Sequence, residues 1–189
     1  MVNEGMSIAA GTAIVQAHNN ARVFAFDQAT VHAYDHAVVT AHGRCTVFAY
    51  DNSWVEAADA VKLFAHDTSC IEACGRVDVI ASGRSRIIAG DHATVTAAGN
   101  CLVKAGDHTT IIASGYAKVE AAGNAKVVAN DRVTVVARET SAVNGYGDAY
   151  IDADVSASTL GFQNATIYGA ERTRLENKDR SGYKCRSGY

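Results

Sequence analysis

Two Asp-His pairs are the residues of this sequence whose types and spacing could bind a metal. Asp91-His92 and Asp107-His108 lie 16 residues apart, and carboxylate and imidazole groups are ligands of Zn²⁺ where four of them converge. The competing interpretation is local, because Asp tolerates the backbone of a tight turn and the His after it would then be exposed. We favour the turn interpretation and predict no metal and no other cofactor.

The sequence offers no catalytic set. It has no phosphate-binding loop, no nucleophile elbow and no HExxH motif. Solenoid hydrolases carry their active sites on long loops, and the repeat described below has no insertion that would form one. We therefore predict that the protein is not an enzyme.

The composition bears on fold and partners. The chain has 189 residues, 48% of them hydrophobic; Ala and Val dominate, and proline is absent. Side chains this small fill only a thin interior. The net charge of −3 predicts neither a nucleic-acid nor a membrane partner. The N-terminal residues lack the regions of a secretory signal, so we expect a cytoplasmic protein or one exported without a conventional signal peptide.

An eight-residue unit repeats over residues 5–172 without insertion or deletion. If Ala21 is position 1 of its unit, position 5 is alanine in 17 consecutive units over residues 9–137. Position 3 is Val, Ile or Leu in 17 units over residues 15–143, and position 7 is Gly, Asp or Asn as far as residue 131. Alternation of small apolar and variable positions predicts a short strand with one inward face, and position 7 predicts a turn.

Two or three units could make one coil. Three units give a triangular 24-residue coil, which would stack His18 on His42, and two give a flattened 16-residue coil, which would stack Ser53 on Ser69. Ala and Val cannot fill a triangle with sides of ~16 Å, and empty apolar space is costly. We predict an all-β fold, a β-solenoid with two units per 16-residue coil, and keep the 24-residue triangular coil as the alternative.

Residues 81–92, Ala-Ser-Gly-Arg-Ser-Arg-Ile-Ile-Ala-Gly-Asp-His, resemble the arginine-containing coils near the C-terminal end of the repeat region in bacterial ice-nucleation proteins. The resemblance implies a two-sheet solenoid built from paired eight-residue half-coils. The ice-organising signature of that family, a repeated Gly-Tyr-Gly-Ser-Thr-x-Thr, is absent from this sequence. The resemblance therefore implies the fold and the coil size, and not ice nucleation.

We expect four segments along the chain: an N-terminal cap (1–12), a regular solenoid (13–144), degenerate C-terminal coils with a cap (145–172) and a basic, Tyr-containing tail (173–189). Terminal repeats depart from the repeat because they close the core against water. From Glu171 onwards the chain has six basic and three acidic residues, a net charge of +3 that leaves −6 for the rest. The tail is either a solubilising extension or a docking arm, and we predict docking on a coil end or a neighbouring molecule. The residues expected to dock are Arg180, Tyr183, Cys185, Arg186 and Tyr189.

The outward positions of every second unit predict a contact surface. In a 16-residue coil, position 4 of these units places large apolar side chains in one row, and position 6 places aromatic rings in a second row beside it. A row of exposed apolar side chains on a flat sheet is typical of an interface, although stacked rings also stabilise their own sheet. The predicted interface residues are Tyr34, Phe48, Tyr50, Phe64, His66, Ile80, Ile112 and Val128.

The five cysteines show no spacing typical of a disulfide framework. Cys45 and Cys101 occupy position 1 and are expected to be buried. Cys70 and Cys74 point outward about 13 Å apart along one strand and cannot bond to each other. Cys185 in the tail is expected to be the most reactive thiol.

These features together predict a structural or assembly protein that associates with copies of itself as an oligomer or a fibre. The predicted contacts are the flat apolar sheet face, the coil ends, or both, with the tail docking on a neighbour. The alternative is a module that binds a ligand or ice with one flat face. Threonines at position 2 favour the ice alternative, but Lys62 and Asp78 interrupt their row.

Overall fold

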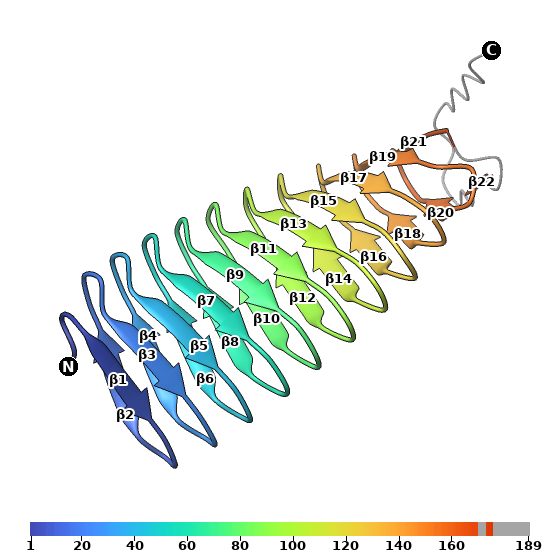
Figure 1. Cartoon of the computed structure of the whole chain (residues 1–189). Coiled ribbons are helices and arrows are strands. Elements are labelled where there is room, and N and C mark those ends of the chain that lie inside the picture. Colours follow the sequence, from blue (N-terminus) through green and yellow to red (C-terminus); the bar gives the residue numbers. More distant parts are fainter. Residues whose placement is uncertain (170–172, 176–189) are drawn as a thin grey trace.

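The computed structural model describes residues 1–169 and 173–175, with side chains for residues 1–169. Coils of similar size stack into a straight rod, with the blue N-terminal coil at one end and the orange coils at the other (Figure 1). The described residues form only strands and turns, so no helix that could cross a membrane occurs among them.

Two parallel sheets of 11 strands each make up the rod. One contains every odd-numbered strand and is called here the odd sheet. Its strands are β1 (Met6–Ala9), β3 (Arg22–Ala25), β5 (Val38–Ala41), β7 (Trp54–Ala57), β9 (Cys70–Ala73), β11 (Arg86–Ala89), β13 (Leu102–Ala105), β15 (Lys118–Ala121), β17 (Thr134–Ala137), β19 (Tyr150–Ala153) and β21 (Thr166–Tyr168).

The other sheet contains every even-numbered strand and is called the even sheet. Its strands are β2 (Ile14–Ala17), β4 (Thr30–Ala33), β6 (Thr46–Ala49), β8 (Lys62–Ala65), β10 (Asp78–Ala81), β12 (Thr94–Ala97), β14 (Thr110–Ala113), β16 (Lys126–Ala129), β18 (Ala142–Gly145), β20 (Ser158–Gly161) and β22 (Thr173–Leu175).

The strand register fixes the size of the coil. Each strand pairs with the strand two places further along the chain, so that Val47 on β6 is the partner of Leu63 on β8. From β1 to β21 one coil is therefore two eight-residue units, one in each sheet; the last pairing, of Thr159 on β20 with Thr173 on β22, spans 14 residues. The predicted β-solenoid with 16-residue coils is confirmed, and the triangular 24-residue alternative is wrong for the described residues, because Ala and Val are large enough to fill only the space between two facing sheets.

Positions 1, 3 and 5 of the units form the thin core, where Cys45, Val47 and Ala49 are each fully buried. A buried hydroxyl at position 1 can be satisfied locally, since the Ser85 hydroxyl donates to the Ser82 carbonyl three residues back at 2.7 Å. The Ser53 hydroxyl is an exception and has no hydrogen-bond partner. Position 1 therefore takes Ala, Ser, Thr, Cys or Val, which share small size rather than polarity.

Position 7 turns the chain in a left-handed conformation, with φ of 54° at Asp91 and 73° at Gly83. A Cβ added to Gly83 would lie 2.9 Å from the Asp67 carbonyl oxygen, so glycine is the residue that fits this close approach. Where Asp stands at position 7, its carboxylate also reaches the coil before it: the Gly75 N–H donates to Asp91 at 2.9 Å.

Candidate interaction surface

A row of stacked rings occupies position 4 on the outer face of the even sheet. His32, Phe48 and Phe64 lie on the adjacent strands β4, β6 and β8 in direct register. Ring centroids are 4.7 Å apart for His32–Phe48 and 4.8 Å apart for Phe48–Phe64, with planes within 9° of parallel. Because parallel strands in register repeat every ~4.8 Å, identical rotamers bring neighbouring rings to stacking distance.

A second row of four rings runs beside the first at position 6, where each even strand ends. It consists of His18, Tyr34, Tyr50 and His66, with centroid distances of 4.7, 5.0 and 5.1 Å along the row. Residues two apart on a strand lie on the same face at roughly 7 Å, so the two rows are neighbours. We call their seven residues the aromatic patch: His18, His32, Tyr34, Phe48, Tyr50, Phe64 and His66.

Beyond the aromatic patch, the position-4 row along the even sheet holds Ile80, Ile112 and Val128, with Thr96 between the two isoleucines. Ile80 is 50% exposed and Ile112 is 43% exposed, and Val128 is half-buried. All eight predicted interface residues therefore lie in the two outward rows of one sheet. His32, which the sequence-based interface set lacked, belongs with them, and its 16-residue spacing from Phe48 is the signal that could have found it.

Two histidines at the ends of the position-6 row contact polar groups of the coil that follows each of them. The His66 Nδ1 lies 3.0 Å from the Ser82 hydroxyl, and the His18 Nδ1 lies 3.8 Å from an Asp35 carboxylate oxygen. The His18 Nε2 is buried and has no hydrogen-bond partner among the described residues. These contacts fix the rings at both ends of the row.

Tyr50 lies in the middle of the position-6 row. Burial, with the Tyr34 and Asp67 charges as smaller contributions, raises the pKa of Tyr50 above its ordinary value. A phenol is neutral at physiological pH even at the ordinary value of 10.0, and the raised pKa keeps Tyr50 neutral to still higher pH.

Charge is sparse on the outer face of the even sheet. Leaving histidines aside, positions 2 and 4 from β2 to β20 carry three charged side chains, namely Lys62, Asp78 and Lys126. Lys62 and Asp78 are in direct register on β8 and β10, and both are exposed. A mostly uncharged face, with apolar side chains along position 4 and one adjacent pair of opposite charges, is suited to contact with another protein surface.

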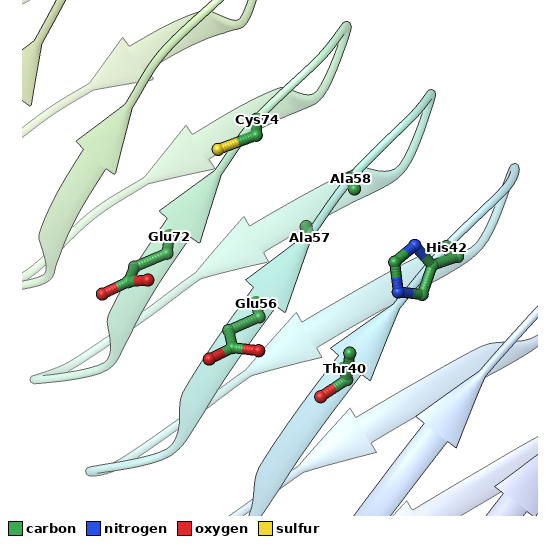
Figure 2. A pocket seen from close by; sticks show the side chains of 7 residues that line it. All are labelled: Thr40, His42, Glu56, Ala57, Ala58, Glu72 and Cys74. Atoms are coloured by element: carbon green, nitrogen blue, oxygen red, sulfur yellow. The ribbon is translucent and has the colours of Figure 1, made fainter.

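The odd sheet has a different character. Glu56 and Glu72 face outward in direct register, and they line a shallow groove of about 260 Å³ whose floor includes Ala57 and Ala58 (Figure 2). Ala58 is at position 6 of its unit, and His42 and Cys74 are at position 6 in the coils before and after it. The groove lies over Ala58 because its side chain is smaller than those of these two neighbours. Further along, the Lys104 ammonium pairs with Glu120 at 3.0 Å.

The two Asp-His pairs lie in successive turns that follow odd strands. The Asp91 N–H donates to the Asp107 carboxylate at 3.2 Å, and the rings of His92 and His108 stack with centroids 5.2 Å apart. Both carboxylates therefore serve the turns, as the local interpretation requires. Across residues 1–169, no group of three or more His, Cys, Asp or Glu side chains is arranged to hold a metal ion.

The cysteines lie close to their expected places. Cys45 and Cys101 are fully buried at position 1, where their thiols donate to the carbonyls of His42 and Ala98 at 3.1 Å. Cys70 is half-buried on β9, and Cys74 is exposed immediately after that strand. The expected docking residues of the tail, Arg180, Tyr183, Cys185, Arg186 and Tyr189, lie outside the described residues.

Sequence reasoning missed the hydrogen bonds that join one turn to the next. The position-7 N–H donates to the position-7 carboxylate of the following coil, as Gly11 does to Asp27 at 3.0 Å and Gly43 to Asp59 at 3.0 Å. The signal was the order of residues at position 7 in the turns after odd strands, where a Gly is followed one coil later by an Asp.

Comparisons with family models, with curated proteins and with solved structures found no match to this chain.

Proposed function

We propose that the protein is a non-catalytic assembly protein whose rods associate with one another through the outer face of the even sheet. The observation that carries this proposal is the pair of adjacent side-chain rows on that face, the aromatic patch and its aliphatic continuation through Ile80, Ile112 and Val128. Burying an apolar surface of this kind against another protein is favourable, at roughly 25 cal/mol per Å².

The coil ends offer a second route to assembly. Among the described residues, the strands β1 and β21 have one neighbour each in the odd sheet, so one edge of β1, at the N-terminal end of the rod, offers backbone groups for pairing with another chain. Met6 and Ile8 on β1 are each 70% exposed, which adds an apolar contribution at the N-terminal end. Growth from the ends would give fibres, and the basic tail would then dock on a neighbouring rod.

Light scattering on the double variant Phe48→Ser with Phe64→Ser tests the face. The native protein is expected to have at least twice the mass of one chain, and the variant is expected to be a monomer. The matched control is Ile88→Ser with Val136→Ser, which changes position 4 of the odd sheet and should leave the mass unchanged. An unchanged mass in the first variant, or a native monomer, contradicts the proposal.

The alternative function is binding of ice or another ligand by one flat face. In-register threonines favour it, since Thr30 pairs with Thr46 and Thr94 with Thr110 at position 2 of the even sheet. A thermal-hysteresis assay separates the two functions, because an assembly protein is expected to give a blank.

A further inference from the structure

We propose that the partner of the even sheet is a second copy of this chain, packed face to face in the opposite direction along the rod. This inference rests on the proposed function and adds the symmetry and the residue pairing. The two-fold axis lies in the interface, parallel to the strands, and passes between β8 and β10. Each position of one chain then faces the same position of the other chain.

The charged side chains locate the axis. Lys62 and Asp78 sit at position 2 on β8 and β10, in direct register. Among the ion pairs of the described residues neither takes part, so both are available to a partner. A two-fold axis between them sets Lys62 of each copy against Asp78 of the other, which makes two contacts between opposite charges at the centre. An axis through either residue would instead set like charges against each other.

The sizes of the side chains agree with that axis. Counted outwards from it, the bulky position-6 residues His66, Tyr50 and Tyr34 meet Ser82, Ala98 and Ser114 of the second copy. At position 4, Phe64 meets Ile80, Phe48 meets Thr96 and His32 meets Ile112. At position 2, Thr46 meets Thr94 and Thr30 meets Thr110. At the outermost pair of strands, β2 and β16, Ile14 meets Lys126 and Gln16 meets Val128. Over the six central strands, β4 to β14, the aromatic half of the face is complementary to its own smaller half.

Other arrangements match less well. An axis that sets Asp78 against Lys126 would press Tyr50 onto Phe162 and place Phe64 over Asn144. A pair of rods running in the same direction would set Phe48 on its own copy and Lys62 against His66. Both combinations put bulk on bulk and lose the contacts between Lys62 and Asp78, whereas the proposed arrangement leaves Lys126, at its rim, as the one unmatched charge of the three.

The contact area fits a dimer of modest affinity. Eight even strands, β2 to β16, overlap in this arrangement. At ~4.8 Å per strand and with roughly 14 Å of strand length across positions 2 to 6, the face covers about 500 Å² per chain. The total of about 1,000 Å² is near the lower limit for a specific interface.

A charge-swap experiment tests the pairing. The variants Lys62→Asp and Asp78→Lys are prepared separately, their fold is checked by circular dichroism, and their masses are measured by sedimentation equilibrium alone and as an equal mixture. Each variant alone has two like-charge contacts at the axis and is expected to dimerise roughly 100-fold more weakly than the native chain. In the mixture each new charge faces its opposite, so heterodimers are expected with an affinity within about 10-fold of the native dimer.

Mixing is the decisive step. Any effect of a substitution on the fold of its own chain is the same in the single-variant sample and in the mixture, so a gain in dimer on mixing comes from the contact between the two chains. If the mixture stays monomeric, the antiparallel pairing is overturned while association through the face still stands on the Phe48 and Phe64 variant. If the single variants dimerise like the native chain, the placement of the axis is overturned. A native chain that is monomeric at all concentrations removes both the pairing and the proposed function.

Discussion

The rings of Phe48 and Phe64 lie 4.8 Å apart between centroids, with planes 9° from parallel, although a whole coil of the chain separates them. Strand register brings them together, since each extends from position 4 of its own unit. Their contact belongs to one chain and is distinct from the contact that each is proposed to make with a second copy.

A double-mutant cycle on Phe48 and Phe64 should reveal that contact as a coupling energy. We expect Phe48→Ala and Phe64→Ala together to destabilise the fold less than the sum of the two single changes, by about 0.5–1 kcal/mol. Urea unfolding followed by the fluorescence of Trp54, the one tryptophan, measures it. The control pairs Phe48 with Ile112, which lies four coils away at ~19 Å and should show additive changes; additive changes for both pairs contradict the prediction.

Substitutions at Asp91 should separate the two roles of position 7. Its backbone has φ of 54°, and its carboxylate accepts a hydrogen bond from the Gly75 N–H at 2.9 Å. Asp91→Asn keeps both features and should change the free energy of unfolding by less than about 0.5 kcal/mol.

Asp91→Gly keeps the backbone conformation but loses the hydrogen bond, at a cost of about 1 kcal/mol. Asp91→Ala also loses the hydrogen bond, and an alanine held in the left-handed backbone conformation costs a further ~1–2 kcal/mol, as for an ordinary L-residue. The expected order of stability is Asn, Gly, Ala from most to least stable, measured by thermal and urea unfolding. An Ala variant as stable as the Gly variant would show that backbone strain at this turn is negligible.

The buried thiols should make the fold less stable at alkaline pH. Burial raises the pKa of Cys45 and Cys101 above the ordinary value of 9.0. Below pH 9 the thiol is protonated in both states and its contribution is constant; above pH 9 the unfolded thiol ionises first, so stability falls as pH rises towards the folded pKa.

The variant Cys45→Ala with Cys101→Ala isolates this effect, because alanine already occupies position 1 in many coils and Tyr50 remains in both proteins. We expect its free energy of unfolding to fall less steeply than that of the native chain between pH 9 and 10.5, measured by urea unfolding in steps of pH. Equal slopes for the two proteins would mean that these thiols do not control alkaline stability.

The sequence by itself determined the solenoid, because position 5 repeats as alanine without a gap and the small core residues leave room only for two facing sheets. Which outward residues share a face follows once the coil has 16 residues, and the strand register decided that size over the 24-residue alternative. With a constant 16-residue coil and no insertion, Phe48, Phe64 and Ile80 must follow one another on consecutive strands of the even sheet.

Only the tertiary structure decided how neighbouring coils contact each other through side chains. Whether Asp107 would face solvent, a metal or the turn of the preceding coil depends on the direction of its carboxylate, which is set by the left-handed turn and the distance between coils. The ring orientations in the aromatic patch and the hollow over Ala58 have the same origin, since rotamers and the sizes of neighbours in the adjoining coils determine them. Repetition in the sequence specifies the backbone, and packing between coils specifies the surface that a partner would meet.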